Sequence, residues 1–518
     1  MKKTRLLAML LALVLMCSVF AACGGGSGPA ATEAPASEPA ASGHDLAIGT
    51  TGSHLYMYTC GSSESDNFCR RLVYDQLFYI DDFTGEVSSD ILASYSWTDD
   101  VTLHIELKDG ITFSDGTPMT AEDVLFTLQT YVNNSNSEMD WYDMIDYDKS
   151  TVDGLSADIV YKETYGPAIS TLCSPILSKA FIEAHPDGDD AWWYNPIGSG
   201  PYKVEEVQMG VSVKFVKRDD YWNKDARFEA DSITIKYYSD TTAEYSDFNS
   251  GVIDVMLDIT STQVEQVQSL ANAEVVIQSA DDVCMVCFNE ATVPKEVREA
   301  IAYALDINVI SDAVLGIFGT PAQSTLAQTM AEFSPGHSYP YDPDHARQVL
   351  ADAGYSAGEI VLDMVGSSAA DQTTLGEMVQ AMLGDVGITV NVGTYDFATM
   401  LPMLLQGQTD LQRMTTSDGT PQREPLETYS SFVANGTFPA ASIPDEAINE
   451  ALDRGYSTVD PEGRKEAYIE AQQLIFDTFR AIPLYEWNSG YAYNTAKISQ
   501  IDLTSVQRID LRFIYLNE

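Results

Sequence analysis

The fold of this chain is decided by the stretch IVLDMVGSSAADQTTLGEMVQAMLGDVGITVNV, which runs from Ile360 to Val392. Its two ends, 360–365 and 388–392, are short apolar runs rich in Val and Ile, as buried strands are. Between them, 375–383 carries apolar residues at helical spacing. A strand, a helix and a second strand in this order form a parallel pair, because the helix returns the chain to the same end of the sheet. The sequence therefore predicts an α/β fold with a parallel sheet in its second half.

Alternating and capping patterns predict further elements. Apolar residues alternate with polar ones over 101–107, which predicts a half-buried strand. Asp109-Gly110 then predicts a hairpin turn that returns the chain as a strand over 111–113. Other strands are expected at 45–49, 211–216, 233–238, 283–288 and 481–487. Helices are expected from a capping box at Thr120 and Asp123, from Pro294, over 342–354 and over 464–479.

The N-terminal segment predicts export and a tether. Three positive residues precede the apolar run 6–20 and Ala21-Ala22-Cys23, an order typical of a secretory signal, whereas a transmembrane helix would need about 20 apolar residues. The ending resembles a bacterial lipoprotein processing box, which implies a signal peptide over 1–22 and a diacylated Cys23. The alternative is an ordinary cleavage with an incidental cysteine. Residues 24–43 contain no large apolar side chain, so 23–43 is interpreted as the lipidated cysteine and a flexible tether.

Composition excludes some partners and leaves room for two to three domains. The formal net charge is −49 at pH 7, and loss of the three positive residues of the signal makes it −52. Such a chain repels the phosphates of nucleic acids and the head groups of anionic lipids. An apolar content of 45% together with 28 Tyr indicates a folded protein rather than an acidic disordered one. No nucleic-acid partner is expected, and the membrane is contacted through the lipid anchor only.

The cysteines and histidines predict neither a disulfide framework nor a metal site. Seven cysteines are present, and an odd number remains once one leaves with the signal and Cys23 is lipidated. Cys284 and Cys287 stand three apart in an expected strand and point to opposite faces, so they are interpreted as core residues rather than a redox or zinc pair. Whether Cys60 and Cys69 form a bridge is left open by the sequence. The histidines show no metal-ligand spacing, and no cofactor is expected.

Seven short motifs, in order along the chain, resemble one protein family. The segment GITFSDGTPMTAEDV at 110–124 closely resembles the signature of family 5 extracytoplasmic solute-binding proteins of ABC importers, which are oligopeptide, dipeptide and nickel receptors. Further matches follow at 195–202, 218–222, 250–255, 298–306, 346–355 and 481–485. The resemblance covers about residues 45 to 500. Most of its motifs are turns, caps and apolar helix faces, which belong to the scaffold.

The resemblance implies a two-lobed, periplasmic-binding-protein-like fold of type II, in the large class with an extra subdomain in lobe one. The implied segments are 44–74, 191–279 and 481–518 for lobe one, 75–190 for the extra subdomain and 280–480 for lobe two. Such proteins close on their ligand about a hinge. The resemblance further implies a monomeric receptor outside the cytoplasm, anchored to the bacterial cell membrane. It would capture an oligopeptide or similar small solute and deliver it to the ABC permease subunits, without catalysis.

Two loops are implied to contact the ligand. The first follows the opening strand and carries Ser53 and His54, and this chain departs from peptide receptors, which often have an acidic residue near His54. The second follows 408–414, where peptide receptors often show a Trp and then an Asp that pairs with the amino group of the ligand. The Trp is missing here, and the candidate Asp is Asp418. The alternatives are a plain surface loop for His54 and a Ser-Asp-Gly turn for Asp418.

A third implied contact is 485–491, where the chain crosses back to lobe one. Tyr485, Trp487 and Tyr491 are spaced to face one side of a strand. Core packing explains Tyr485 equally well, whereas Trp487 is the better candidate for a wall of the ligand site.

Other functions are weighed against this one. Within the family, the alternatives are a nickel-chelate receptor and a glycan or glycopeptide receptor. A secreted hydrolase would need a nucleophile, a metal or a pair of acids, and the sequence has no Gly-x-Ser-x-Gly, no His-x-x-x-His and no phosphate-binding loop. A surface adhesin would predict internal repeats and a large exposed apolar patch, and no repeat is found.

Overall fold

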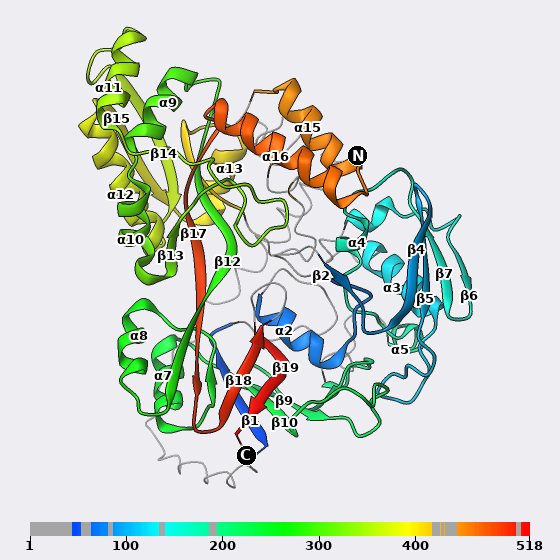
Figure 1. Cartoon of the computed structure of the whole chain (residues 1–518). Coiled ribbons are helices and arrows are strands. Elements are labelled where there is room, and N and C mark those ends of the chain that lie inside the picture. Colours follow the sequence, from blue (N-terminus) through cyan, green and yellow to red (C-terminus); the bar gives the residue numbers. More distant parts are fainter. Residues whose placement is uncertain are drawn as a thin grey trace, which may run out of the picture. The chain divides into compact units, whose positions relative to one another are not determined.

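The computed structural model describes residues 44–52, 64–80, 86–133, 140–185, 194–416, 425, 429, 443–503 and 509–517 (Figure 1). All of them belong to one compact unit, Ser42–Glu518. The expected signal peptide, Cys23 and the tether lie outside the described residues, as does Cys60.

Within the described residues, a sheet of eleven strands runs through the protein. Its order is β15 (Ile388–Tyr395), β14 (Ile360–Ser367), β16 (Leu411–Thr416), β12 (Ala273–Phe288), β17 (Ala481–Asn494), β11 (Val255–Met256), β1 (Asp45–Thr50), β10 (Ser232–Tyr237), β9 (Ser212–Lys217) and β8 (Tyr202–Gln208), with β13 (Gly319–Pro321) paired to β17. The long strands β12 and β17 are antiparallel partners from 273 to 287 and connect the two parts of the sheet. Figure 1 shows them as the two extended arrows between α7 and α16.

Three smaller sheets complete the strands of the described residues. A four-stranded sheet has the order β4 (Leu92–Asp99), β5 (Thr102–Leu107), β7 (Ser156–Val160) and β6 (Thr151–Asp153). Two hairpins pair β2 (Tyr79–Ile80) with β3 (Val87–Ser88) and β18 (Ile498–Leu503) with β19 (Ile509–Leu516). All four strands of the first of these sheets are antiparallel to their neighbours, so no crossover helix is needed within it.

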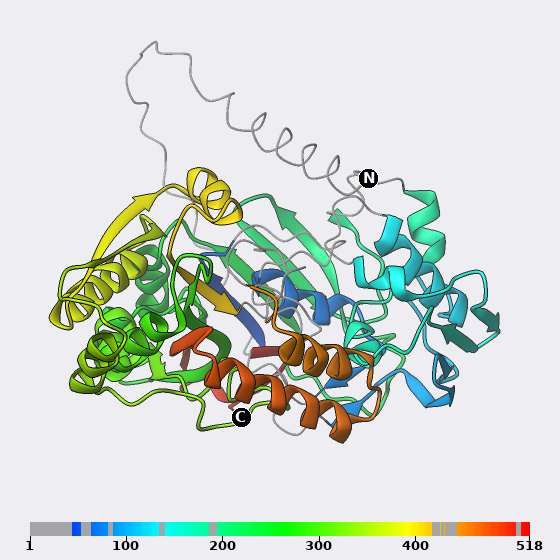
Figure 2. The ribbon, with the colours of Figure 1, turned by 90° about the horizontal axis from the view of Figure 1, so that it is seen from above.

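Helices cover the faces of these sheets (Figure 2). They are α2 (Glu64–Val73), α3 (Ala121–Asn133), α4 (Ala168–Thr171), α5 (Lys179–Ala184), α7 (Thr241–Ser250), α8 (Ser261–Gln268), α9 (Lys295–Ala304), α10 (Ile307–Leu315), α11 (Pro343–Asp352), α12 (Ala370–Asp385), α13 (Phe397–Leu405), α15 (Glu446–Ser457) and α16 (Pro461–Asp477), with short 3-10 turns η1 (Asp140–Met144) and η2 (Gly316–Phe318). None of the described helices alone has the length and apolar character to cross a membrane. The pair formed by α9 and α10–η2 passes the same criterion together but bends by 65°.

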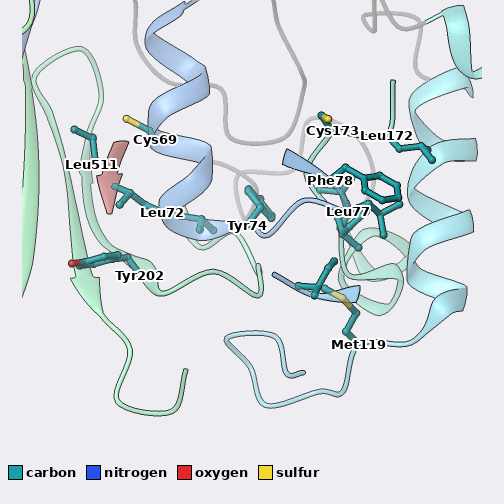
Figure 3. Close-up of a cluster of buried hydrophobic side chains, with 14 of the residues drawn as sticks. Cys69, Leu72, Tyr74, Leu77, Phe78, Met119, Leu172, Cys173, Tyr202 and Leu511 are labelled. Carbon is teal, nitrogen blue, oxygen red and sulfur yellow. The ribbon is translucent and has the colours of Figure 1, made fainter. Parts of the chain in front are cut away.

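Three large hydrophobic cores, and a small cluster of Val365, Met400 and Leu404, hold the described residues together. The first core packs β1, α2, the four-stranded sheet and β19, and Figure 3 shows part of it. The second core lies between β12, β14, β15 and helices α9, α10 and α12, and the third lies between β12 and α15 and α16. Some of their members are Leu72, Phe78, Tyr202 and Leu511 in the first, Val286, Leu305, Leu375 and Tyr485 in the second, and Met285, Cys287, Leu452 and Ile475 in the third.

The predicted strand–helix–strand unit is confirmed. Strands β14 and β15 are parallel with Ile360 opposite Ile388, and α12 connects them. The helix expected over 342–354 is α11, whose cap Asp342 accepts a hydrogen bond from the His345 amide at 2.9 Å. At the start of α3, the Asp123 carboxylate accepts the Thr120 amide at 2.8 Å, which is the predicted reach of a capping box.

The predicted hairpin at Asp109-Gly110 is wrong. Strand β5 ends at Leu107 and pairs on one side with β4, which directly precedes it, and on the other with β7, which comes from later in the chain. The segment after it folds on itself instead: the Phe113 amide donates to the Thr117 carbonyl at 2.8 Å and the Met119 amide to the Ile111 carbonyl at 3.0 Å. The expected return strand over 111–113 does not form because β4 and β7 already pair with the two edges of β5.

The interpretation of the two neighbouring cysteines as core residues is confirmed. Cys284 and Cys287 lie on β12 and are 1% and 2% exposed. Cys284 faces the second core and Cys287 the third, as the alternation of side chains along a strand requires.

Candidate functional site

The directions of the strands bring two sets of strand ends toward each other. In one part of the sheet, β1, β10 and β11 are parallel, and β11 is antiparallel to β17. In the other part, β14, β15 and β16 are parallel, while β16 and β17 are both antiparallel to β12. The carboxyl ends of the two sets therefore point at each other along the β12–β17 crossing. Ligands of open α/β sheets bind outside the carboxyl ends of their strands, so the candidate site lies between these two edges.

The first edge holds the start of a predicted contact loop in place. The Asp258 carboxylate follows β11 and accepts hydrogen bonds from the Thr50 hydroxyl at 2.9 Å and the Thr51 amide at 2.6 Å. The Thr50 hydroxyl in turn accepts the Gly52 amide at 3.0 Å. These contacts fix the chain just before Ser53 and His54, which lie outside the described residues.

A buried carboxyl group supports this first edge. Glu244 on α7 is 0% exposed, and its Oε1 accepts the backbone amides of Leu257 at 3.0 Å and Asp258 at 3.4 Å. Its Oε2 is buried without a hydrogen-bond partner. Burial, and then the nearby Asp258 carboxylate, raise the pKa of Glu244 to about 8. Glu244 is therefore protonated at neutral pH and holds the backbone behind Asp258 without adding a second charge.

The approach of Glu244 to β1 requires a glycine on that strand. A Cβ atom on Gly49 would lie 2.9 Å from Cγ of Glu244 and 2.5 Å from Cδ1 of Ile253. Both distances are shorter than side chains tolerate, so any other residue at 49 would push Glu244 or Ile253 away. The conformation of this edge therefore depends on the fit of α7 against β1.

The second edge carries a positive charge held in a defined position. Arg413 lies on β16 opposite Val286 of β12. It comes directly after Leu411 and Gln412, the two residues of β16 that pair with β14. Its Nη2 lies 3.4 Å from the Asp371 carboxylate, which belongs to the first turn of α12. Its Nε lies 3.3 Å from Sγ of Cys284. The side chains of Arg413 and Asp371 are 13% and 19% exposed, so the pair is mostly desolvated but reachable from the space at this edge.

The Cys284 thiol at this edge stays neutral. Burial raises the pKa of Cys284, and Arg413 opposes this shift. The thiol thus acts as a soft packing and hydrogen-bonding neighbour that orients the guanidinium rather than as a reactive group.

The three aromatic residues predicted on the crossing strand lie in three different environments. Tyr485 is 0% exposed and packs in the second core, and Tyr491 is 5% exposed and packs in the first. Trp487 lies between them, 37% exposed, opposite Asp282 of β12 and Gly319 of β13. Asp418 lies outside the described residues. Of the candidates predicted from the sequence, Trp487 is the described residue that offers a surface at the crossing.

Sequence reasoning missed Arg413, Asp371, Glu244 and Asp258. One signal was available for Arg413, because it is the only Lys or Arg in the sequence between Arg347 and Arg423. Its partner Cys284 is 129 positions away, and no local pattern joins them. Among the residues that the structure describes, no group of three or more His, Cys, Asp or Glu side chains is arranged to hold a metal ion.

Residues 86–437 match the bacterial extracellular solute-binding proteins, family 5 (middle region). The chain therefore belongs to this family, which comprises solute-binding proteins of ABC importers with a two-lobed fold. Members of the family work outside the cytoplasm and are not enzymes. The fold and the family resemblance predicted from the motifs are thereby confirmed.

Particular relatives are similar along most of their length. Heme-binding protein A of Haemophilus influenzae is 22% identical over 459 residues, which cover 81% of this chain and 82% of the relative. Glutathione-binding protein GsiB of Escherichia coli is 24% identical over 456 residues, covering 85% and 88%. A solved dipeptide binding protein from Pseudoalteromonas, in complex with Met-Leu, has a TM-score of 0.71 at 20% identity and covers 91% of this chain and 100% of that one. The last likeness shows the fold.

Proposed function

We propose that this chain is the receptor of an ABC importer for an oligopeptide or a similar small zwitterionic solute. It captures the solute between its two lobes and delivers it to the permease subunits as a monomer. The membership of the family supports the transport role. The choice of solute depends on the charges at the two edges of the site.

The observation that carries this proposal is the Arg413–Asp371 pair. A guanidinium presents several N–H donors in one plane and binds carboxylates in a bidentate way. Asp371 and Cys284 hold Arg413 from one side and leave part of its surface exposed at the strand ends. A solute with a carboxylate can therefore bind here without reorganising the side chain, which lowers the entropic cost of binding.

The remaining candidates complement the other end of such a solute. Asp418 follows Arg413 by five positions and is proposed to pair with an amino group of the ligand. Trp487 is proposed as a wall of the site and Ser53 and His54 as further neighbours of the ligand, whereas the buried Tyr485 and Tyr491 are proposed to support the crossing strand on either side of Trp487. The glutathione and Met-Leu of the two relatives both carry an amino and a carboxylate group, which agrees with this choice.

Calorimetric titration of the ligand-free protein tests the proposal. Di-, tri- and tetrapeptides with free ends should bind, and the same peptides with an amidated C-terminus should bind at least about tenfold more weakly, because a charge-assisted hydrogen bond is lost. Nickel–histidine complexes and oligosaccharides, the ligands of the rival receptors, serve as the comparison. Binding of either of these with no response to any peptide would contradict the proposal.

The lipid anchor at Cys23 is part of the same proposal. It is supported by the position of Cys23 after Ala21-Ala22 and before the polar segment 24–43. Changing Cys23 to Ala should release the protein from the membrane fraction into the medium or periplasm. If the variant is still extracted by detergent only, the anchor lies elsewhere.

A further inference from the structure

A second connection joins the first core to the helices of the third core, apart from the β12–β17 crossing. Helix α15 buries Ile448, Ala451 and Leu452 in the third core. Tyr456, near its end, packs against the first core instead. The ring of Tyr456 meets the ring of Tyr165 edge-on, with centroids 5.3 Å apart and planes at 75°. Figures 1 and 2 both show the C-terminal end of α15 and the start of α16 near α4, which follows Tyr165.

The backbones of the two parts also touch. The Gly166 amide donates a hydrogen bond to the Tyr456 carbonyl at 2.7 Å. A Cβ atom on Gly166 would lie 2.6 Å from the Thr458 carbonyl oxygen, 2.8 Å from the Tyr456 carbonyl oxygen and 2.9 Å from Nη1 of Arg464. All three atoms belong to α15, α16 or the turn between them. Gly166 does not have a left-handed φ, so glycine is needed here for the close approach and not for the turn.

Each side of this contact is rigidly supported. Tyr165 is 3% exposed, and its ring lies 5.5 Å from the ring of Tyr161 between centroids. The ring of Tyr161 in turn lies 5.9 Å from that of Trp97. On the other side, Arg464 pairs with Glu332 at 3.2 Å. A contact between two rigid surfaces can open or close as a unit but cannot stretch, because packed interfaces are not continuously deformable.

We propose that Tyr165, Gly166 and Tyr456 form a latch that engages when the two lobes close and stabilises the ligand-bound form. This inference rests on the proposed capture of a solute between the lobes. In this proposal the crossing strands β12 and β17 act as the hinge, and the contact between 165–166 and Tyr456 forms when the two bodies come together. A ligand shifts such an equilibrium by its differential affinity for the closed form, and the latch adds to that difference. One backbone hydrogen bond and one aromatic pair are enough to change affinity about tenfold.

Hydrogen exchange of the Gly166 amide measures the latch directly. The Gly166 amide donates across the contact, to the Tyr456 carbonyl. The Thr171 amide donates to the Pro167 carbonyl at 2.9 Å, on the same side of the contact as Gly166. In the ligand-free protein, Gly166 should show a protection factor at least about tenfold lower than Thr171, because the latch opens without unfolding of the subdomain. This comparison needs no ligand, so it tests the latch even if the proposed solute is wrong. Equal protection of both amides would show a permanent contact and overturn the latch.

A single methyl group tests the effect on binding. Gly166→Ala places a methyl against α15 and α16 alone and should weaken binding of a peptide found by titration about tenfold, while its ligand-free form keeps the wild-type melting temperature within a few degrees. Gly384→Ala is the matched control, since a Cβ there meets no atom within 4 Å, and it should bind as wild type. Tyr456→Ala should weaken binding to a similar degree, and the double variant no more than about twofold further. Wild-type affinity of Gly166→Ala in a protein that binds peptides would overturn the latch, whereas absence of any binding in wild type would overturn the proposed function.

Discussion

The two edges of the candidate site use charged residues in opposite ways. At the first edge, Glu244 is buried with its proton and serves as an acceptor for the backbone behind Asp258. At the second edge, Arg413 and Asp371 form an ion pair, and both side chains keep part of their surface exposed. Both edges lie at the carboxyl ends of parallel strands. Each holds a carboxylate in contact with a neighbour, Asp258 with Thr50 at the first edge and Asp371 with Arg413 at the second. The difference supports a division of roles: the first edge fixes the backbone of residues 50–52, and the second is proposed to present a charge to a solute.

The physical reason lies in the neighbours of each carboxyl group. No cation contributes to the pKa of Glu244, so burial and the negative Asp258 favour its neutral form. Asp371 has a guanidinium 3.4 Å away and sits in the first turn of a helix, where negative charge is favoured. A neutral acid cannot anchor a charged ligand. A partly exposed ion pair can, because the carboxylate of the ligand can share or replace Asp371 as the partner of Arg413.

Of the changes at the two edges, removal of Arg413 should weaken peptide binding the most. Arg413→Ala leaves the carboxylate of a bound solute desolvated without a partner, which typically costs about 3–5 kcal/mol. Calorimetry should therefore show affinity for a free peptide lower by about a hundredfold to a few thousandfold. The double variant Arg413→Ala/Asp371→Asn removes the carboxylate left behind, so it should regain melting temperature but not binding. An Arg413→Ala protein that binds peptide within threefold of wild type would refute the role of this edge.

Asp418 is expected to give the next largest effect. Asp418→Asn should weaken binding by at least about a hundredfold, or 2.7 kcal/mol, because the amino group of the ligand loses its counter-charge. The melting temperature of the ligand-free variant should stay near the wild-type value, since the Ser-Asp-Gly sequence around Asp418 predicts an exposed turn rather than part of a core. Calorimetry with a peptide and its N-acetylated form provides the control, and the acetylated form should not distinguish the variant from wild type.

Glu244→Gln tests the first edge through the pH dependence of the melting temperature. Because the pKa of Glu244 is raised from 4.5 to about 8, the native state holds a proton that the unfolded state releases between these values. Wild-type stability should therefore fall as pH rises from about 4.5 to about 8, and Gln removes this slope. The variant should melt a few degrees higher than wild type at pH 9 and at the same temperature at pH 4. A Glu244→Gln protein with the wild-type pH profile would show that Glu244 is ionised in the native state.

Trp487 should give the smallest of these effects. Trp487→Ala removes a half-exposed ring and should weaken binding about tenfold, while Trp487→Phe keeps most of the stacking surface and should weaken it less. The order of the variants carries information of its own. If Asp418→Asn binds normally and Trp487→Ala does not bind, the site recognises its ligand by stacking, as sugars are recognised, and the amino anchor is wrong.

Local sequence patterns predicted much of the scaffold. The unit of β14, α12 and β15 was readable because its strands and helix differ in period and length, and the cap at Asp342 because capping is a local event. The placement of Cys284 and Cys287 followed from the alternation of side chains on β12. The predicted hairpin at Asp109-Gly110 is wrong because both edges of β5 are already paired, one with the preceding β4 and the other with β7, which comes from later in the chain.

The candidate site was less predictable, because its contacts join residues that are far apart in the sequence. Arg413 meets Cys284 across 129 positions, and Asp258 meets Thr50 across 208. No periodicity or cap motif connects such pairs. Glu244 looked like any acidic residue on a helix, and its protonated state arises only from the packing of α7 against β1 and β11. The predictions for Ser53, His54 and Asp418 lie outside the described residues and stay predictions.

The most direct measurement is mass spectrometry of the solute carried by the protein. Wild type and Arg413→Ala/Asp371→Asn would be purified gently in parallel, denatured, and the released small molecules compared. The proposed function predicts that wild type releases a peptide or another zwitterionic solute in near-stoichiometric amount, and that the double variant releases almost none. A metal complex or a neutral glycan from wild type, or the same solute in equal amount from both proteins, would contradict it.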